Sequence, residues 1–134
     1  MGFIAQRLTA ISRLSLRHCG SITDQGVRLI TARFNQNLTH LHLSRCHQLT
    51  DLTLESIARY CTQLLTLDMA RCNNLTDRYE FEGKRVKLNT FNSGFYTFAA
   101  SCCKIQRMDL EECLNITDNS LLQLSIHCPC LKGK

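Results

Sequence analysis

No uninterrupted apolar run in this sequence approaches the roughly 18 residues that a membrane span requires. The first residues, MGFIAQRLTA, also lack the apolar core of a secretory signal. Gln6 stands where a myristoylation signal has Ser or Thr. We therefore expect a soluble protein that has no membrane segment and carries no recognisable targeting signal.

Clustered positive charge is lacking too, although the formal net charge is +5. The basic residues are spread along the chain, and two of them, Lys132 and Lys134, lie at its extreme end. Nucleic-acid binding is normally marked by a basic patch or stripe. We therefore predict no nucleic-acid partner.

The motifs of common enzyme classes are absent as well. The sequence has no glycine-rich phosphate loop, no G-x-S-x-G and no paired catalytic carboxylates. It has no C-x-x-C, and Cys102-Cys103 and Cys128-Pro129-Cys130 are poor spacings for metal ligands. We predict no catalytic residue, no bound metal and no cofactor, and we do not expect an enzyme.

What the sequence does contain is one pattern in four copies. The pattern is L-x-x-L-x-L-x-x-C-x-x-[IL]-T-D, and Cys, Thr and Asp recur at the same three offsets in every copy, which is very improbable by chance. The repetition therefore fixes the fold class. The copies are ISRLSLRHCGSITD (11–24), LTHLHLSRCHQLTD (38–51), LLTLDMARCNNLTD (64–77) and IQRMDLEECLNITD (105–118).

The periodicity within each copy predicts its secondary structure. The central Leu-x-Leu alternates between two faces, as a short strand with one buried face does. Asp24, Asp51 and Asp118 stand just before the next apolar stripe and are predicted to be helix N-caps. The stripe has the i, i+3, i+4, i+7 spacing of a helix: Leu54, Ile57, Ala58 and Cys61 in the second copy, and Leu121, Leu124, Ser125 and Cys128 in the fourth.

Units of one strand, one turn and one helix cannot bury their apolar faces alone, so they must stack. The predicted fold is an α/β leucine-rich-repeat solenoid, a curved rod with short parallel strands on the concave face and helices on the convex face. We place the repeat region at 8–131, with repeats near 8–34, 35–60, 61–101 and 102–127, the start of a fifth repeat at 128 and a tail at 132–134.

Two sets of equivalent positions account for all but two of the nine cysteines. A thiol is small and apolar enough to be buried, and it can donate a weak S–H hydrogen bond to a turn carbonyl. We therefore predict a structural role and inert thiols. The ladder after the strands is Cys19, Cys46, Cys72 and Cys113, the set at the helix ends is Cys61, Cys102 and Cys128, and Cys103 and Cys130 remain as surface or end-exposed thiols.

Unpaired buried thiols also imply a reducing compartment, so the cytoplasm or the nucleus is the expected setting. Three glycosylation sequons begin at Asn37, Asn74 and Asn115. Each overlaps the repeat signature, which supplies the same residues for packing reasons. We expect these sequons to be unused.

The third repeat carries an insertion, because Cys46 and Cys72 are 26 residues apart whereas Cys72 and Cys113 are 41 apart. The extra segment is RYEFEGKRVKLNTFN (78–92), after which SGFYTFAASC is predicted to resume the helix with its apolar residues in register. Asn92 is predicted to cap this helix in place of Asp77.

Within the insertion, Tyr79 and Phe81 are followed, across Glu82-Gly83, by Val86 and Leu88, a pattern typical of a small hairpin. One interpretation is a protrusion that binds a partner. The other is a solvated loop that arises from altered splicing or an uncorrected gene model, and the sequence does not separate the two.

The outward strand positions are predicted to line the concave face, which solenoids generally use for binding. Their charge runs from basic near the N-terminus to acidic near the C-terminus, so a partner of opposite gradient gains orientation and association rate. The alternative is a merely solvated sheet face. The positions are Arg13, Ser15 and Arg17, then His40, His42 and Ser44, then Thr66, Asp68 and Ala70, and finally Arg107, Asp109 and Glu111.

Two histidines, His40 and His42, are predicted on one side of the same strand, where two imidazoles can share a metal. No carboxylate or thiol stands at suitable spacing beside them in the sequence, and Cys46 is expected to point inward. We therefore do not predict zinc binding.

The extended pattern C-x-x-L-x-x-L-x-L-x-x-C-x-x-I-T-D resembles the repeat of F-box and leucine-rich-repeat proteins, most closely at MDLEECLNITDNSLLQLSIHCPCL (108–131). In that family an N-terminal F-box docks on the linker protein of an SCF ubiquitin ligase, and the concave repeat face holds the protein to be ubiquitinated. The resemblance therefore implies a protein substrate as partner and substrate recognition as function.

This chain shows no F-box-like segment before its first repeat and no C-a-a-X box at its end, so we expect a fragment or a short isoform of such a protein. Contact with the SCF linker protein is then expected only through an F-box that this chain lacks. The alternative function is a leucine-rich-repeat scaffold or inhibitor unconnected to ubiquitination. We also expect the last repeat, without a capping repeat, to lower solubility or promote self-association.

Overall fold

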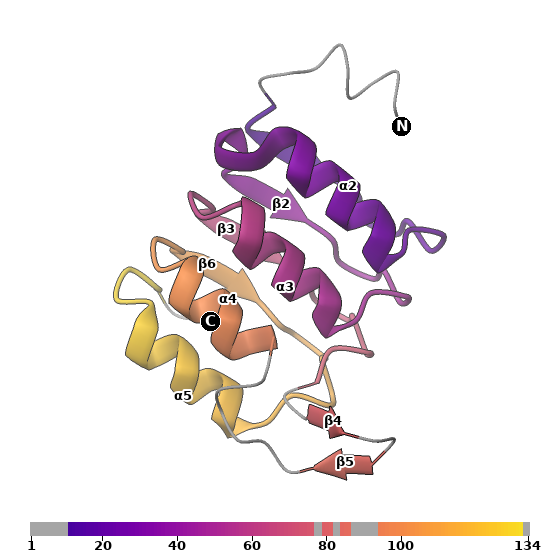
Figure 1. Ribbon diagram of the computed structural model, residues 1–134, viewed down its shortest axis with the longest axis vertical. Helices are drawn as coiled ribbons and strands as arrows, with labels where there is room; N and C mark the ends of the chain where they lie inside the picture. Colours follow the sequence, from indigo (N-terminus) through magenta and orange to yellow (C-terminus); the bar gives the residue numbers. More distant parts are fainter. Residues whose placement is uncertain (1–10, 77–78, 82–83, 87–93, 133–134) are drawn as a thin grey trace.

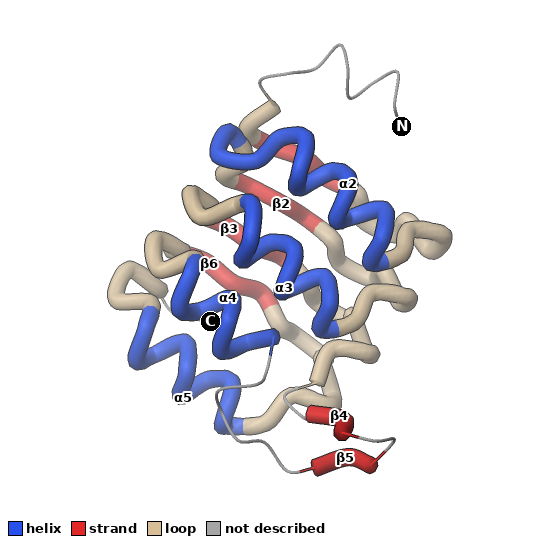
Figure 2. The backbone as a smooth tube through the Cα atoms, in the orientation of Figure 1, coloured by secondary structure: helices blue, strands red, loops and turns tan. Residues whose placement is uncertain are grey.

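A computed structural model of the chain describes residues 11–76, 79–81, 84–86 and 94–132 (Figure 1). It has two layers, a sheet of short strands and a row of helices that covers one face of the sheet (Figure 2). The strands are parallel and lie side by side in chain order, apart from the inserted segment: β1 (Arg13–Ser15), β2 (His40–His42), β3 (Thr66–Asp68) and β6 (Arg107–Asp109).

Each strand is followed by the helix of its own repeat. A short 3-10 helix, η1 (Asn35–Asn37), follows the first of them. Consecutive helices pack against one another in the order of the chain. The helices are α2 (Asp24–Phe34), α3 (Asp51–Tyr60), α4 (Gly94–Ser101) and α5 (Asp118–His127).

The core lies between the two layers and is built from equivalent apolar residues of successive repeats. The central strand residues Leu14, Leu41, Leu67 and Met108 are aligned in register across the sheet, and the last three are buried. Neighbouring strands lie about 4.8 Å apart whereas packed helices need about 8–10 Å. The helix layer is therefore longer than the sheet layer, so the stack curves with the sheet on its concave side. This confirms the predicted α/β leucine-rich-repeat fold.

Backbone pairing extends beyond the three-residue strands into the following turn. The N–H of Leu16 donates to the carbonyl of His42 at 2.8 Å, and that of His18 donates to the carbonyl of Ser44 at 3.0 Å. The residue before each ladder cysteine has a left-handed backbone, at a cost of about 1–2 kcal/mol for a residue that is not glycine. The hydrogen bond that the N–H of His18, Arg45 or Arg71 donates to the next repeat offsets part of this cost. These residues are His18, Arg45, Arg71 and Glu112, with φ of 62°, 60°, 60° and 58°.

The prediction that aspartates cap the helices was wrong. Thr23 and Thr50 are the N-cap residues, and the hydroxyl of Thr50 accepts a hydrogen bond from the N–H of Leu52 at 3.3 Å. Asp24 is the first helical residue, and its carboxylate accepts bonds from the next repeat instead. Asp51 likewise begins α3, and Asp118 begins α5.

The carboxylate of Asp24 forms a staple between repeats. It accepts from the N–H of Thr50 at 2.9 Å, from the Thr50 hydroxyl at 2.6 Å and from the Thr53 hydroxyl at 2.6 Å. The carboxylate of Asp51 accepts from the N–H and hydroxyl of Thr76 in the same way, at 2.8 and 3.0 Å. Charge-assisted hydrogen bonds of this kind are roughly twice as strong as neutral ones. The Thr-Asp pair of the repeat therefore joins repeats rather than capping one helix.

The cysteine ladder has the predicted role, with one exception. The Sγ atoms of Cys46, Cys72 and Cys113 each lie 3.1 Å from a carbonyl of the preceding repeat. Cys19 belongs to the first repeat and is only partly buried, and its Sγ lies 3.9 Å from the carbonyl of Arg17 in its own repeat. A thiol that donates between repeats must stay protonated. Burial favours this, because it raises the pKa of Cys72 to about 12.

The second cysteine set lies at the helix ends, as predicted. Cys61, Cys102 and Cys128 are buried, and the Sγ of Cys102 lies 3.4 Å from the carbonyl of Cys61. Burial raises the pKa of Cys61 to about 12 and that of Cys128 to about 11. Cys103 and Cys130 are exposed. These positions agree with inert ladder thiols and two surface thiols.

The insertion leaves the stack as a separate hairpin. Strands β4 (Tyr79–Phe81) and β5 (Lys84–Val86) pair antiparallel, with Tyr79 opposite Val86, as the hydrophobic pattern predicted. Figure 1 shows this hairpin beside the stack and outside the row of helices. Asp77, Leu88 and Asn92 lie outside the described residues, and with them the predicted capping by Asn92.

The chain rejoins the stack at Gly94, the first residue of α4. Gly94 occupies the place that Thr53 has in the preceding repeat, and a Cβ there would lie 2.8 Å from the backbone oxygen of Asp51. The close approach lets the helix resume in register. As predicted, Phe95, Phe98 and Ala99 are fully buried.

The last repeat is only half buried. Leu124 and Cys128 face the core, but Leu121 is 50% exposed and Ser125 is exposed, so the predicted four-residue stripe packs on one side only. Lys132 was expected to begin a tail. Its N–H donates to the carbonyl of Gln106 at 2.8 Å, which continues the backbone pairing of the sheet beyond β6.

We expect Gly94→Ala to lower the free energy of unfolding by about 1–3 kcal/mol, because the added methyl must push against the Asp51 backbone. Gly20→Ala is the matched control, since a Cβ at Gly20 meets nothing within 4 Å. Urea unfolding of both variants measures the difference. Equal effects at the two glycines would show that α4 does not depend on this close approach.

We expect the fold to lose stability in alkali. An unfolded thiol ionises near its ordinary pKa, whereas burial keeps Cys61 and Cys72 protonated in the fold up to a pKa of about 12. The folded state therefore binds more protons in that interval, and the free energy of unfolding falls as pH rises through it. The free energy of unfolding, measured with denaturant at a series of pH values, should fall less steeply with pH for Cys72→Ala than for Cys103→Ala, which removes an exposed thiol. Identical slopes would contradict the assignment.

Candidate protein-interaction face

The outward residues of the four strands form rows across the sheet. The strand register places Arg13, His40, Thr66 and Arg107 in one row, called here the first row, and Ser15, His42, Asp68 and Asp109 in the second. The positions two residues further on, Arg17, Ser44, Ala70 and Glu111, follow in the same strand order. The structure therefore brings all twelve predicted concave-face residues onto one surface.

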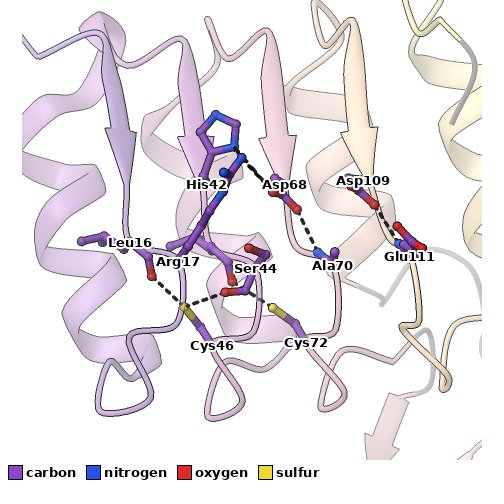
Figure 3. A network of polar contacts seen from close by, with 11 residues as sticks. Leu16, Arg17, His42, Ser44, Cys46, Asp68, Ala70, Cys72, Asp109 and Glu111 are labelled. Carbon is purple, nitrogen blue, oxygen red and sulfur yellow. Dashed lines mark hydrogen bonds and ion pairs between the residues drawn. The ribbon is translucent and has the colours of Figure 1, made fainter.

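Three of these residues contact one another across three repeats (Figure 3). The guanidinium of Arg17 lies 3.1 Å from Nδ1 of His42 and 3.5 Å from a carboxylate oxygen of Asp68. His42 Nδ1 lies 3.6 Å from the same oxygen. The side chain of Arg17 is 54% exposed, so this ion pair adds at most about 1 kcal/mol. Its main effect is to orient the three side chains on the face.

The acidic residues of the face are also held by the backbone. An oxygen of Asp68 accepts a hydrogen bond from the N–H of Ala70 at 3.1 Å, and one of Asp109 accepts from the N–H of Glu111 at 2.9 Å (Figure 3). Each carboxylate thus turns toward the end of its own strand. The equivalent position in the second repeat is His42, which cannot make this contact as an anion. The last two repeats therefore present oriented carboxylates, and the first two do not.

The hydrogen bonds assign a tautomer to one of the two histidines. Arginine only donates, so Nδ1 of neutral His42 must accept from Arg17 and its proton is on Nε2. The Thr39 hydroxyl lies 3.1 Å from the carbonyl of Ser12 and 2.9 Å from Nδ1 of His40, and its single proton can serve only one of these two acceptors. Nε2 of neutral His42 is therefore a donor.

The electrostatic environment of His40 is positive. Desolvation, the charge of Arg13 and the presence of His42 lower the pKa of His40 below its ordinary value of 6.5. Desolvation is the largest cause. His40 thus reports on the field at the N-terminal end of the first row. In the described part of the chain, no group of three His, Cys, Asp or Glu side chains is arranged to hold a metal ion.

The predicted gradient of charge holds only in part. Arg13 and Arg17 lie on β1 and Asp109 and Glu111 on or just after β6, but Arg107 lies on β6 as well. In the residues that the structure describes, no acidic side chain pairs with Arg13 or Arg107. The first row therefore has an arginine at each end and no acidic group, whereas acidic groups occur in the other rows.

One feature of the surface beside this face was not foreseen. The side-chain amides of Gln48, Asn74 and Asn115 form a second ladder, in which each donates to a carbonyl of the preceding repeat at 2.7–2.8 Å. Their common offset from the ladder cysteine was visible in the sequence. The amide nitrogens of Asn74 and Asn115 are those that glycosylation would modify, which favours the expectation that these sequons are unused.

Comparison with known proteins identifies relatives of the repeats. A leucine-rich-repeat family profile matches residues 9–30 and 34–58. Lysine-specific demethylase 2B of Mus musculus is 33% identical over 76 residues, which cover 54% of this chain and 6% of that protein. F-box/LRR-repeat protein 4 of Bos taurus is 25% identical over 128 residues, which cover 85% of this chain and 20% of that protein.

A similar structure is known in yeast. A chain in the crystal structure of the complex of Rad7 and Elc1 superposes with a TM-score of 0.71 at 21% sequence identity, over 91% of this chain and 27% of that chain. At this identity the match shows the fold alone. It confirms the stack of parallel strands and helices described above.

Fold, repeat pattern and relatives define the chain as a leucine-rich-repeat solenoid of the protein-interaction class. Its repeats are similar to those of F-box/LRR-repeat protein 4, in agreement with the resemblance that the residue pattern indicated. The chain spans only 6% and 20% of the length of the two curated relatives. No helix in the described ranges has both the length and the apolar character to cross a membrane.

We expect Arg13→Ala to raise the pKa of His40 toward its ordinary value, because it removes a neighbouring positive charge. A histidine whose folded pKa is depressed stabilises the fold above its unfolded pKa and loses that contribution as pH falls through the folded pKa. The variant should therefore be less sensitive to mild acid. NMR titration of the His40 ring measures the shift, and Arg28→Ala on the helix layer is the control. An unchanged His40 pKa would contradict the assigned field.

Proposed function

We propose that the concave face formed by the four strands recognises a protein substrate of an SCF-type ubiquitin ligase. The strand register supports this most directly, because it sets polar and charged side chains in fixed rows on a rigid sheet. Binding residues held by a rigid element lose less conformational freedom on association than residues on a mobile loop. Leucine-rich repeats typically serve as such interaction modules rather than as enzymes.

The ligase connection is supported by the similarity to F-box/LRR-repeat protein 4, which extends over 85% of this chain. In this proposal the described repeats supply the recognition surface, and docking on the ligase is the work of an F-box outside the residues discussed here. Similar repeats also occur in lysine-specific demethylase 2B, whose name refers to demethylation and not to a ubiquitin ligase. A scaffold or inhibitor unconnected to ubiquitination is therefore the second candidate.

The unpaired charges of the concave face favour a partner that carries complementary charges. Arg17, His42 and Asp68 satisfy one another, whereas Arg13, Arg107 and Glu111 are exposed and have no partner among the described side chains. Complementary charges mainly raise the association rate and suppress wrong partners. Exposed charges that lack an internal partner are thus the positions where substitution should affect recognition first.

The test is affinity capture from cytosol with the full chain as bait. One variant carries Arg13→Ala and Glu111→Ala on the face, and the control carries Arg28→Ala and Glu55→Ala on the helix layer, so that each loses one exposed cation and one exposed anion. We expect proteins that the face variant loses and the control retains. The loss of two exposed charges, at up to about 1 kcal/mol each, corresponds to a loss of up to roughly thirtyfold in affinity.

The lifetime of the captured proteins then separates the two candidates. Substrates of an SCF-type ligase should persist longer in cells when cullin ligases are inactivated. Captured proteins whose lifetime does not change would favour the scaffold or inhibitor. Equal capture by both variants would contradict recognition on the concave face.

A further inference from the structure

The first row differs from the rest of the face in having cations without anions. Arg13 and Arg107 are exposed at its two ends, with His40 and Thr66 between them. Asp68, in contrast, has Arg17 and His42 as partners, and Glu112 has Arg71 at 2.6 Å. Among the described residues, Asp68 and Glu112 thus have cationic partners, whereas Asp109, Glu111 and the two arginines of the first row form no ion pair.

The length of the row defines the spacing of a matching ligand. Its end residues lie on β1 and β6, which are separated by three strand-to-strand steps of about 4.8 Å each, or roughly 14 Å in total. An extended peptide advances about 3.3 Å per residue. Two acidic side chains about four residues apart in an extended segment would therefore span the distance between Arg13 and Arg107.

We propose that the first row binds an extended acidic segment of a protein partner, which crosses the strands and places one carboxylate at Arg13 and another at Arg107. This inference rests on the proposed use of the concave face and adds the chemistry of its partner. The middle of the segment lies over His40 and Thr66.

The two ends of the row are not equivalent. Among the described residues, the outward neighbours of Arg13 along its strand and across the row are Ser15 and His40, and neither is acidic. Arg107 is followed on the same face by Asp109, whose charge offsets part of its field. Arg13 therefore attracts a carboxylate more strongly than Arg107 does, and substitution of Arg13 should weaken binding more.

His40 gives a local signal for this binding. The groups that face it are Arg13 from β1 and His42 from its own strand, while Thr66 from β3 is uncharged. A carboxylate that binds beside Arg13 cancels part of the positive field and favours the protonated imidazole. Linkage then requires the acidic segment to bind more tightly as pH falls through the His40 transition.

The experiment uses the full chain and three capped peptides, followed by NMR. The first peptide has two glutamates four residues apart, the second has the same composition with the glutamates adjacent, and the third has glutamine in their place. We expect the spaced peptide to bind most tightly and to raise the pKa of His40. Arg13→Ala should weaken it by up to about fivefold, Arg107→Ala by less, and the control Arg28→Ala not at all.

Several outcomes would overturn the proposal. These are equal binding of all three peptides, chemical-shift changes centred outside the first row, and an equal loss in Arg28→Ala. The proposed ligase function fails separately. The single variants Arg13→Ala and Glu111→Ala, used as baits in the same capture, distinguish the two failures. If capture is lost with Arg13→Ala but the lifetime of the captured proteins does not depend on cullin ligases, the acidic preference stands without the ligase. If capture is lost with Glu111→Ala and not with Arg13→Ala, the face is used but the acidic preference is wrong.

Discussion

Everything in this structure depends on side chains that hydrogen-bond to the neighbouring repeat. At three successive boundaries a cysteine thiol lies 3.1 Å from a carbonyl of the preceding repeat. Beside it, the Asp24 carboxylate accepts three hydrogen bonds from the second repeat. Each of these carbonyls also accepts from a backbone N–H, so the thiol adds a second donor, whereas the loss of the Asp24 carboxylate would leave the N–H of Thr50 without its acceptor, at a cost of about 1–3 kcal/mol. The same contacts set the register of the strands, and the register sets the rows of the concave face.

The repeat pattern predicts most of the fold because it records contacts that recur. Cys, Thr and Asp return at fixed offsets, and an identical environment at each boundary is the physical reason. The error over the aspartates has the same origin. Within a single repeat Asp24 stands where a capping residue belongs, and its true donors, on Thr50 and Thr53, become apparent only when a second repeat is stacked on the first. Local sequence rules therefore assigned the correct residues to the wrong partners.

The sequence predicted which residues lie on the concave face, but it did not predict their contacts with one another. Strand alternation correctly placed the twelve outward residues on one side of the sheet. The sequence does not reveal which charges satisfy one another, because Arg17 reaches residues 25 and more positions away in the chain. The tautomer of neutral His42 depends in the same way on Arg17. Chemistry at this face is thus a property of the stack and not of any one repeat.

The joint at Gly94 has a consequence for variation in this family of repeats. The segment between Thr76 and Gly94 begins and ends at fixed places on the stack, since Thr76 is bonded to Asp51 and Gly94 lies against the same residue. The entropy of closing a flexible loop grows only with the logarithm of its length, by about 0.6 kcal/mol for each doubling. Evolution can therefore lengthen, shorten or replace this segment at little thermodynamic cost, and the solenoid gains an adjustable appendage without any change in its repeats.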